Sequence, residues 1–312
     1  MSFIARISCP ASHILLLRPR VLPIYSLFFS IQKRALTKPP KPIPISSSAS
    51  SFKIEDLKAL KVSFRPASSK DIVIPPVEAK NYPKNYELPQ IYPQTLLDPK
   101  FDVENLNISD KYIQTYIDNL YDVVKNSGLD KGTDESKTDT LVMNLLDRVV
   151  DMNGWPFKVR QHPLCQLVIR GEIVSARPEF VVGAKRIMMI AVEDKHLRNK
   201  MLSRRSGFGE AQIAAEILAC GSENLRGVYQ HNYVDQEIFA IRAVSTYFTF
   251  YRTVIASSYW EELESGLPKI NSVVIDRWPA MNELKNDLDF AEPEKRKIVL
   301  EALTKIREYI LQ

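Results

Sequence analysis

A cluster of charged residues directly follows an apolar stretch in the middle of the chain. Six apolar residues from Ile187 to Val192 precede Glu193-Asp194-Lys195. A continuous apolar run is typical of a central strand that is covered on both faces. Alternate residues of a strand share a face, so Glu193 and Lys195 project together while Asp194 points away. Charges at the end of a buried strand cost free energy unless they bind something.

A second carboxylate lies upstream, in Pro178-Glu179. Carboxylate oxygens, together with water and substrate phosphate, form the usual environment of Mg²⁺ in proteins. We therefore expect Glu179 and Glu193 to bind a divalent metal, Mg²⁺ or Mn²⁺. The metal would acidify a bound water, and Lys195 would orient that water and stabilise negative charge in the transition state.

This arrangement resembles the PD-(D/E)xK nuclease superfamily, which is named for a Pro-Asp on one strand and an acidic-x-Lys on the next. The resemblance covers residues 130–255, about 40% of the chain. It implies an α/β (α+β) fold with a restriction-endonuclease-like core, in which helices flank a mixed central sheet. It also implies hydrolysis of phosphodiester bonds by Glu179, Glu193 and Lys195. Supporting roles would fall to Glu135 on the first core helix and to Gln212 on the helix after the acidic-x-Lys strand.

The sequence departs from the family pattern at the first acidic position. Glu179 stands there instead of Asp, so the carboxylate reaches about one methylene further. Glu179 also lies four residues before the expected turn at 183–186, whereas Glu193 lies seven residues after it. A β-bulge or a bend is therefore needed to bring the two carboxylates together.

A structural interpretation of the same residues stays open. Other acidic-x-Lys triplets begin at Asp56, Glu78, Asp98 and Glu283. On this interpretation the triplet at Glu193 is a charged strand end that enters solvent. Glu135 is then a helix-start carboxylate favoured by the helix dipole, and Gln212 is a surface amide.

Basic residues cluster around the triplet. Between Lys185 and Arg205, seven Lys or Arg residues stand against two acidic residues, a local charge of +5. Such a loop beside a metal site would hold phosphates. The residues that we expect to bind nucleic acid are Arg198, Lys200, Arg204 and Arg205, and the alternative is a solvated charged loop.

The charge of the chain is unevenly distributed. Residues 1–54 contain eight Lys or Arg residues and no Asp or Glu, whereas residues 55–312 contain 34 basic and 37 acidic residues. An acid-free N-terminus that contains arginine predicts a mitochondrial transit peptide over residues 1–34, and hence a location in the mitochondrial matrix. A secretory signal peptide with Val21–Ile31 as its apolar core is the alternative.

Proline content and hydrophobic periodicity divide the rest of the chain. Fourteen of the twenty prolines lie before residue 100, which predicts a Pro/Ser-rich linker or extended arm over residues 35–105. We expect a PD-(D/E)xK-like domain over 106–265 and a C-terminal helical extension over 266–312. Periodicity predicts helices near 109–128, 134–152 and 209–219, a short helix around Trp260, a final helix from Pro293, and strands at 164–169, 173–182, 187–192, 225–230, 237–244 and 247–254.

Several classes of protein find no support in the sequence. No apolar stretch reaches the roughly 18 residues of a spanning helix, so no integral membrane segment is expected. Three cysteines and four histidines are too scattered for a structural zinc site. Neither a nucleophile elbow nor a glycine-rich phosphate-binding loop is present.

The expected function is therefore metal-dependent hydrolysis of nucleic acid, with DNA favoured over RNA as the partner. The alternative keeps the fold without the chemistry. In that case the chain is a binding or assembly module of the organelle, and Glu179 marks a relaxed site. The sequence carries no signal for an oligomeric state.

Overall fold

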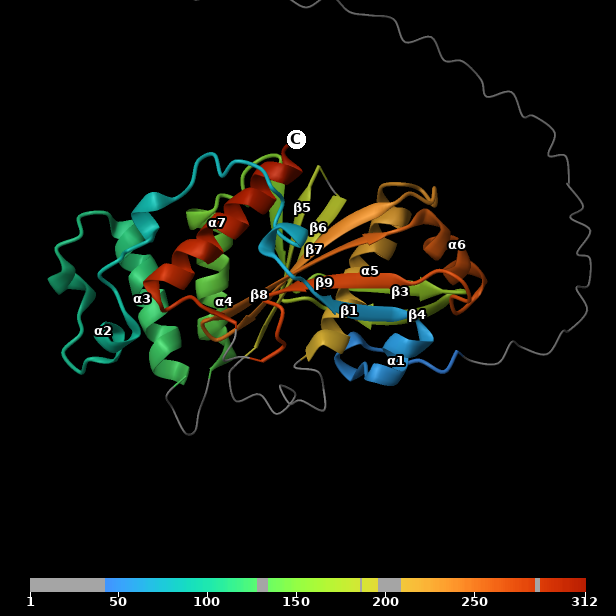
Figure 1. Cartoon of the computed structure of the whole chain (residues 1–312), viewed down its shortest axis with the longest axis horizontal. Coiled ribbons are helices and arrows are strands. Elements are labelled where there is room, and N and C mark those ends of the chain that lie inside the picture. The colour runs from blue at the N-terminus through green and yellow to red at the C-terminus, as the bar shows by residue number, and fades with distance from the viewer. Residues whose placement is uncertain (1–42, 128–133, 186, 196–208, 284–286) are drawn as a thin grey trace, which may run out of the picture. The chain divides into compact units, whose positions relative to one another are not determined.

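A mixed eight-stranded sheet organises the part of the chain that the computed structural model describes, namely residues 43–127, 134–185, 187–195, 209–283 and 287–312, without the side chains of 193–195. Residues Pro42–Gln312 form one unit (Figure 1). The predicted transit peptide lies outside the described residues. The predicted fold class, a mixed sheet flanked by helices, is confirmed.

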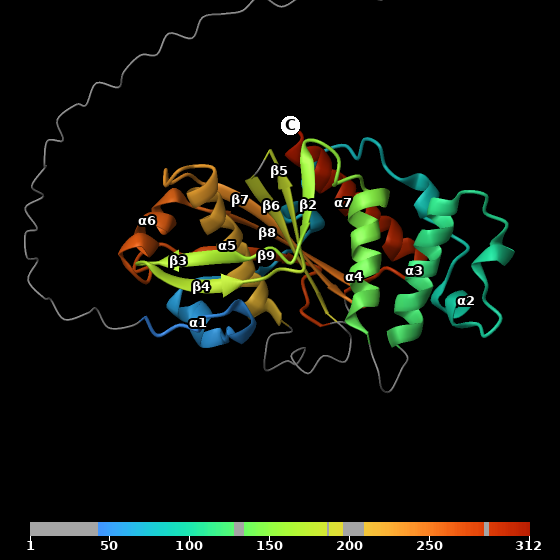
Figure 2. The same ribbon diagram turned by 180° about the vertical axis from the view of Figure 1, so that it is seen from behind.

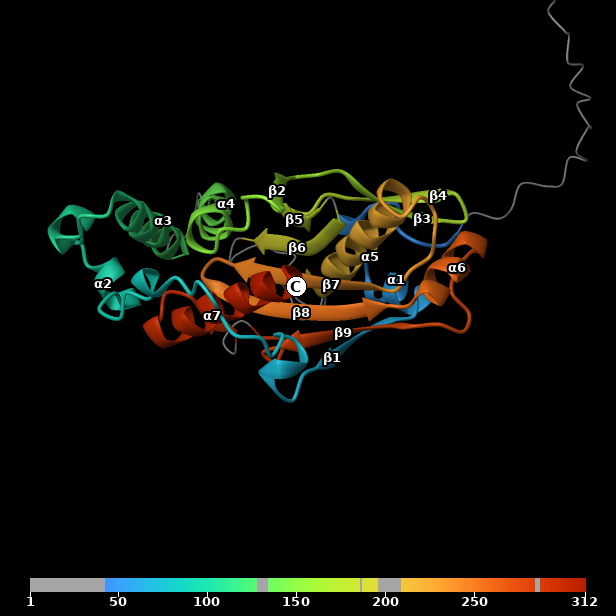
Figure 3. The ribbon, with the colours of Figure 1, turned by 90° about the horizontal axis from the view of Figure 1, so that it is seen from above.

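The strands of the sheet follow one another in the order β1-β9-β8-β7-β6-β5-β2, and the view from above shows this succession (Figure 3). Their bounds are β1 Val62–Pro66, β2 Phe157–Gln161, β5 Phe180–Ala184, β6 Ile187–Lys195, β7 Gln236–Val244, β8 Tyr247–Ile255 and β9 Val273–Trp278, with the short β10 Leu288–Asp289 paired to β8. The pairs β1/β9 and β6/β7 are parallel, and the other neighbours are antiparallel. The strand β2 therefore forms one edge of the sheet.

Helices cover both faces of this sheet. On one face the apolar core includes residues from α2 (Pro93–Leu97), α3 (Lys111–Ser127), α4 (Glu135–Asn144) and α7 (Pro293–Ile310). The core on the other face includes residues from α1 (Ile54–Ala59), α5 (Glu210–Gly227), α6 (Ser257–Ser265) and the hairpin β3–β4 (Cys165–Ile169, Glu172–Ala176). The two groups appear to the left and right in Figure 1. No described helix is both long enough and apolar enough to span a bilayer.

Local sequence explains the principal elements. The predicted stripe of α3 is buried, because its apolar residues recur every three or four positions (Ile113, Tyr116, Ile117, Leu120 and Val124). The apolar run of β6 serves both cores, as predicted for a central strand. Ile190 and Val192 belong to the core beside α4, whereas Ala191 belongs to the core beside α5.

Two of the predicted strands were wrong. The stretch 173–182 is not one strand, because β4 ends at Ala176 and β5 begins at Phe180 in a different sheet. Pro178 separates them, and proline has no N–H to donate to a ladder. The stretch 225–230 is not a strand either, since α5 continues to Gly227 and buries Leu225 against the sheet core. The edge strand β2 and the strand β9 were not predicted.

Strand pairing crosses the predicted boundaries at residues 105 and 265. The segment predicted as a linker or extended arm supplies β1, which pairs along its length with β9 from the predicted C-terminal extension. Arg296 of α7 connects the proline-rich N-terminal segment to the C-terminal helix. Its side chain is fully buried and donates five hydrogen bonds, to the carbonyl oxygens of Glu87, Leu88, Ile91, Phe290 and Ala291. All five N–H groups of the guanidinium can be used in this way, so the proline-rich segment is part of the folded body.

A β-bulge sets the register of the two central antiparallel strands. Val182 pairs with Ile190, but the next residue, Gly183, pairs with Met188, so one residue of β6 is skipped. The bulge that the spacing predicted is therefore confirmed. Gly183 suits this position because an added Cβ would lie 3.0 Å from a backbone carbonyl oxygen of β6.

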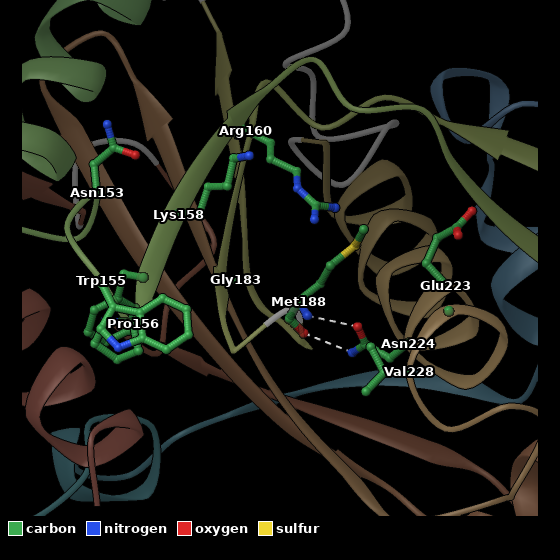
Figure 4. Close-up of a pocket in the computed structure, with 12 residues that line it drawn as sticks. Asn153, Trp155, Pro156, Lys158, Arg160, Gly183, Met188, Glu223, Asn224 and Val228 are labelled. Carbon is green, nitrogen blue, oxygen red and sulfur yellow. Dashed lines mark hydrogen bonds between the residues drawn. The ribbon is translucent and has the colours of Figure 1, made fainter. Parts of the chain in front are cut away.

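A buried amide on α5 holds the strand beside the bulge. The pairing of β6 with β7 begins only at Ile190, so Met188 has no strand partner on that side. Asn224 takes its place: Oδ1 accepts from the Met188 N–H at 2.7 Å, and Nδ2 donates to the Met188 carbonyl at 2.9 Å. Both bonds are drawn in Figure 4. The side chain thus forms the two hydrogen bonds that a neighbouring strand would otherwise make with Met188.

We predict that Asn224→Leu destabilises the fold by about 2–5 kcal/mol, since it leaves a buried N–H and a buried carbonyl unpaired at nearly constant side-chain volume. Urea unfolding followed by circular dichroism measures the loss. The matched control is Asn105→Leu at an exposed position, which should change stability by less than about 0.5 kcal/mol. A loss below about 1 kcal/mol in Asn224→Leu would contradict the role given to this amide.

Candidate functional site

The predicted metal ligands lie at the point where β5 and β6 separate. Phe180 pairs with Val192 in the last described pair of these strands, while β6 continues beside β7 to Lys195. Glu179 precedes Phe180 and Glu193 follows Val192, so each residue lies one step beyond that pair. The bulge makes this register possible, because without it every pair past Gly183 would shift by one residue.

The Glu179 side chain points to groups that the sequence did not assign to the site. Its Oε2 lies 2.8 Å from Nδ1 of His162, which follows the last residue of β2. The backbone continues the ladder there, since the His162 N–H donates to the Glu179 carbonyl at 2.9 Å. His162 has a positive φ of 44°, which breaks the alternation of side chains along β2. The imidazole ring of His162 lies near the ring of Phe180, with centroids 6.5 Å apart.

Asp139 of α4 completes a three-residue cluster. One ligand atom from each of Asp139, His162 and Glu179 lies within 4.8 Å of the other two. Asp139 and Glu179 are half-buried and His162 is exposed, so the cluster is open to solvent on one side. Asp139 and His162 also line a pocket of about 410 Å³ between α3, α4 and the sheet. Figure 2 shows α4 beside β2 on this side of the molecule.

The helix α4 presents Asp139, and not the predicted Glu135, to this cluster. Asp134 caps the helix by accepting from the Ser136 N–H at 3.0 Å, which places Glu135 exposed in the first turn. Asp139 lies four residues further, one turn along the same face. The helix then continues as a π-helical segment, Leu145–Val149.

The remaining predicted residues lie on other elements. Gln212 lies half-buried on α5, and its side-chain amide donates to Oε1 of Glu216 at 2.8 Å. Lys195 ends β6, and the structure gives only its backbone. The basic residues Arg198, Lys200, Arg204 and Arg205 lie outside the described residues.

Two buried ion pairs support the sheet behind Glu193. The β7 residue paired with Glu193 is Arg242, whose guanidinium is 3.1 Å from the Asp287 carboxylate and also donates to Thr249 and Asn282. Burial raises the pKa of Asp287 to about 6, against the opposing attraction of Arg242.

The second pair joins Arg277 to Glu210 in the first turn of α5, at 2.6 Å. Burial raises the pKa of Glu210, while the nearby Arg277 opposes the change. Each pair contains one positive and one negative side chain, so the two pairs together carry no formal net charge.

His162 and Asp139 were not among the predicted site residues. The alternation Phe-Lys-Val-Arg-Gln before His162 is a strand signal, and a histidine directly after it marks the same end of the sheet. Asp139 lies on the same helical face as Glu135, and a helix was predicted there. Which turn of that helix faces the sheet depends on how α4 packs, and hydrophobic periodicity does not determine this.

A scan against protein-family models found no match for this chain, and no curated protein matches it by sequence.

The cluster fits a divalent cation. Three ligand atoms within 4.8 Å of one another can approach a common ion, and two carboxylates supply the hard oxygen ligands that Mg²⁺ and Mn²⁺ prefer. An imidazole ligand favours Mn²⁺ over Mg²⁺.

We predict that full-length protein binds Mn²⁺ and that Asp139→Asn and His162→Ala each weaken binding at least tenfold, because each removes one ligand group. Isothermal titration calorimetry with MnCl₂ gives the dissociation constants. Glu135→Gln, one turn earlier on α4, is the control and should bind like the wild type. Equal affinity in all four proteins would show that the cluster is not a metal site.

Proposed function

We propose that this chain is a metal-dependent nuclease that hydrolyses phosphodiester bonds of nucleic acid. The observation that carries the proposal is the convergence of Asp139, His162 and Glu179 beside the point where β5 leaves β6. A carboxylate and imidazole cluster beside a strand that ends in Glu193-Asp194-Lys195 supplies groups that could hold a divalent metal for phosphodiester hydrolysis.

The residues of the chain have separate tasks in this proposal. Asp139, Glu179 and Glu193 hold the cation, and His162 contributes an imidazole ligand or fixes the Glu179 carboxylate through its Nδ1. A bound divalent cation acidifies water and neutralises charge on the phosphate. Lys195 orients the attacking water and stabilises the negative charge that develops on the phosphoryl oxygens.

Membership of the PD-(D/E)xK superfamily is part of the proposal. The order of elements supports it. Pro178-Glu179 directly precedes β5, and the acidic-x-Lys triplet ends the antiparallel neighbour β6. Helix α5 then leads to β7, which is parallel to β6. The acidic residue of the first core helix is then Asp139. DNA is the favoured substrate, and the basic segment that contains Arg198 and Lys200 would hold its backbone.

We predict that full-length protein cuts labelled DNA in Mn²⁺ or Mg²⁺ and not in EDTA, and that Glu193→Gln and Lys195→Ala each lower the rate at least 100-fold, because each removes a group that acts in the transition state. Plasmid, single-stranded DNA and RNA are tested in parallel.

The chain offers a matched control for this assay in its exposed triplet Glu78-Ala79-Lys80. Glu78→Gln and Lys80→Ala should cut like the wild type. If the Glu193 and Lys195 variants also cut like the wild type, the activity belongs elsewhere. If no metal supports cleavage, the nuclease proposal is wrong, and the chain is better explained as a binding or assembly module with a relaxed site.

We propose the mitochondrial matrix as the location, on the composition of residues 1–34. Full-length protein tagged at its C-terminus should co-localise with a matrix marker. Replacing Arg6, Arg18 and Arg20 with glutamate should leave the tagged protein outside mitochondria, because import depends on the positive charge of the leader. Entry of the wild type into the secretory pathway would contradict the proposal.

A further inference from the structure

A second pocket, with a volume of about 720 Å³, opens between the edge strand β2 and the helix α5 (Figure 4). Trp155 and Pro156 lie at one side of it, and Glu223, Asn224 and Val228 of the α5 end lie at the other. Pockets of this size accommodate ligands of roughly nucleotide dimensions. The pocket shares no lining residue with the cluster of Asp139, His162 and Glu179.

Two cations extend from β2 into this pocket. Lys158 and Arg160 are exposed, and neither side chain has a hydrogen-bond or ion-pair partner in the described part of the chain. Because they are two residues apart on one strand, they share a face and are spaced about 7 Å along it. The acidic lining residue Glu223 is already paired with Arg226 and accepts from the Gln166 N–H at 3.0 Å. The pocket therefore offers positive charge to a ligand.

An aromatic ring stands beside these cations. Trp155 is 89% exposed, whereas Trp260 is buried and Trp278 is half-buried. Exposing an indole ring to water forgoes most of the free energy that burying it would provide. A flat ring in the same pocket as Lys158 and Arg160 matches the two parts of a nucleotide, since bases stack on indole and phosphates pair with Lys and Arg.

The pocket lies along the same edge as the proposed catalytic cluster. Lys158 pairs with Gly183, and four residues further along β2, about 13 Å at the usual rise, His162 adjoins Glu179. The pocket faces α5 and the cluster faces α4. Since β2 is the edge strand, an extended polynucleotide laid along it can contact both.

We propose that this pocket binds a nucleotide of single-stranded nucleic acid, with its base stacked on Trp155 and its phosphates held by Lys158 and Arg160. This inference rests on the proposed nuclease function and deepens it. It specifies that the substrate is single-stranded a few nucleotides from the bond that is cut. A duplex does not fit the same contacts, since its bases are already stacked on one another.

The test is binding of fluorescein-labelled 12-nucleotide DNA and RNA by full-length protein in EDTA, where no cleavage occurs. Fluorescence anisotropy gives the dissociation constants. Trp155→Ala should weaken binding about tenfold, through the loss of one stacked base. Lys158→Ala and Arg160→Ala should each weaken binding and lower the slope of log K against log salt by about 0.7, because each removes one phosphate contact. Exposed residues far from the pocket supply the controls Tyr92→Ala and Lys100→Ala, which should match the wild type.

Intrinsic fluorescence provides a second readout. Trp155 emission should be quenched by the oligonucleotide in the wild type, and the quenching should be absent in Trp155→Phe. Binding of either strand type that depends on these three residues supports the proposal and identifies the preferred sugar. The proposal fails if no single strand binds, if the three variants bind like the wild type, or if a 12-base-pair duplex binds with the same dependence on Trp155.

Parallel cleavage assays in Mn²⁺ separate this inference from the nuclease proposal. Binding that depends on Trp155 without any cleavage would support the binding pocket and contradict the nuclease proposal. Cleavage that is unchanged in the Trp155, Lys158 and Arg160 variants would support the nuclease proposal and contradict the role of the pocket.

Discussion

The register between β5 and β6 is the constraint on which the candidate site depends. A single skipped residue near Met188 lets Glu179 and Glu193 follow the same strand pair, and Asn224 holds that position by replacing the missing strand partner of Met188. A slip of one residue in a sheet turns every following side chain to the opposite face. One buried amide on α5 thus supports the strand register that places Glu179 and Glu193 next to the Phe180–Val192 pair.

The sequence predicted the parts of this arrangement that local patterns determine. The apolar run of β6, the amphipathic stripe of α3 and the need for a bulge could all be read from spacing, and each is present. What could not be read depends on contacts between distant segments. The pairing of β1 with β9 made a proline-rich stretch part of the sheet, and the five carbonyls around Arg296 come from two regions some 200 residues apart. Neither contact has a local signature in the sequence, so neither could be predicted.

The same distinction applies to the site. Glu179 was predicted because proline and a carboxylate adjoin in sequence, and Glu193 because it follows an apolar run. His162 and Asp139 join Glu179 only through the positive φ that turns the imidazole and through the packing of α4 on the sheet. The result is a cluster of two carboxylates and an imidazole near an edge of the sheet that also carries Lys158, Arg160 and an exposed indole. On the proposed function, catalysis and substrate binding would both lie along the edge strand β2.

The most direct test of this account is the position of a bound metal. Crystals of the full-length protein grown with Mn²⁺ should show an anomalous difference peak about 2.0–2.3 Å from ligand atoms of Asp139, His162 or Glu179. That result would establish that the end of β5 and β6 is a metal centre. A map without a peak there, while His162 stays bonded to Glu179, would contradict the central claim and leave the cluster as a structural contact.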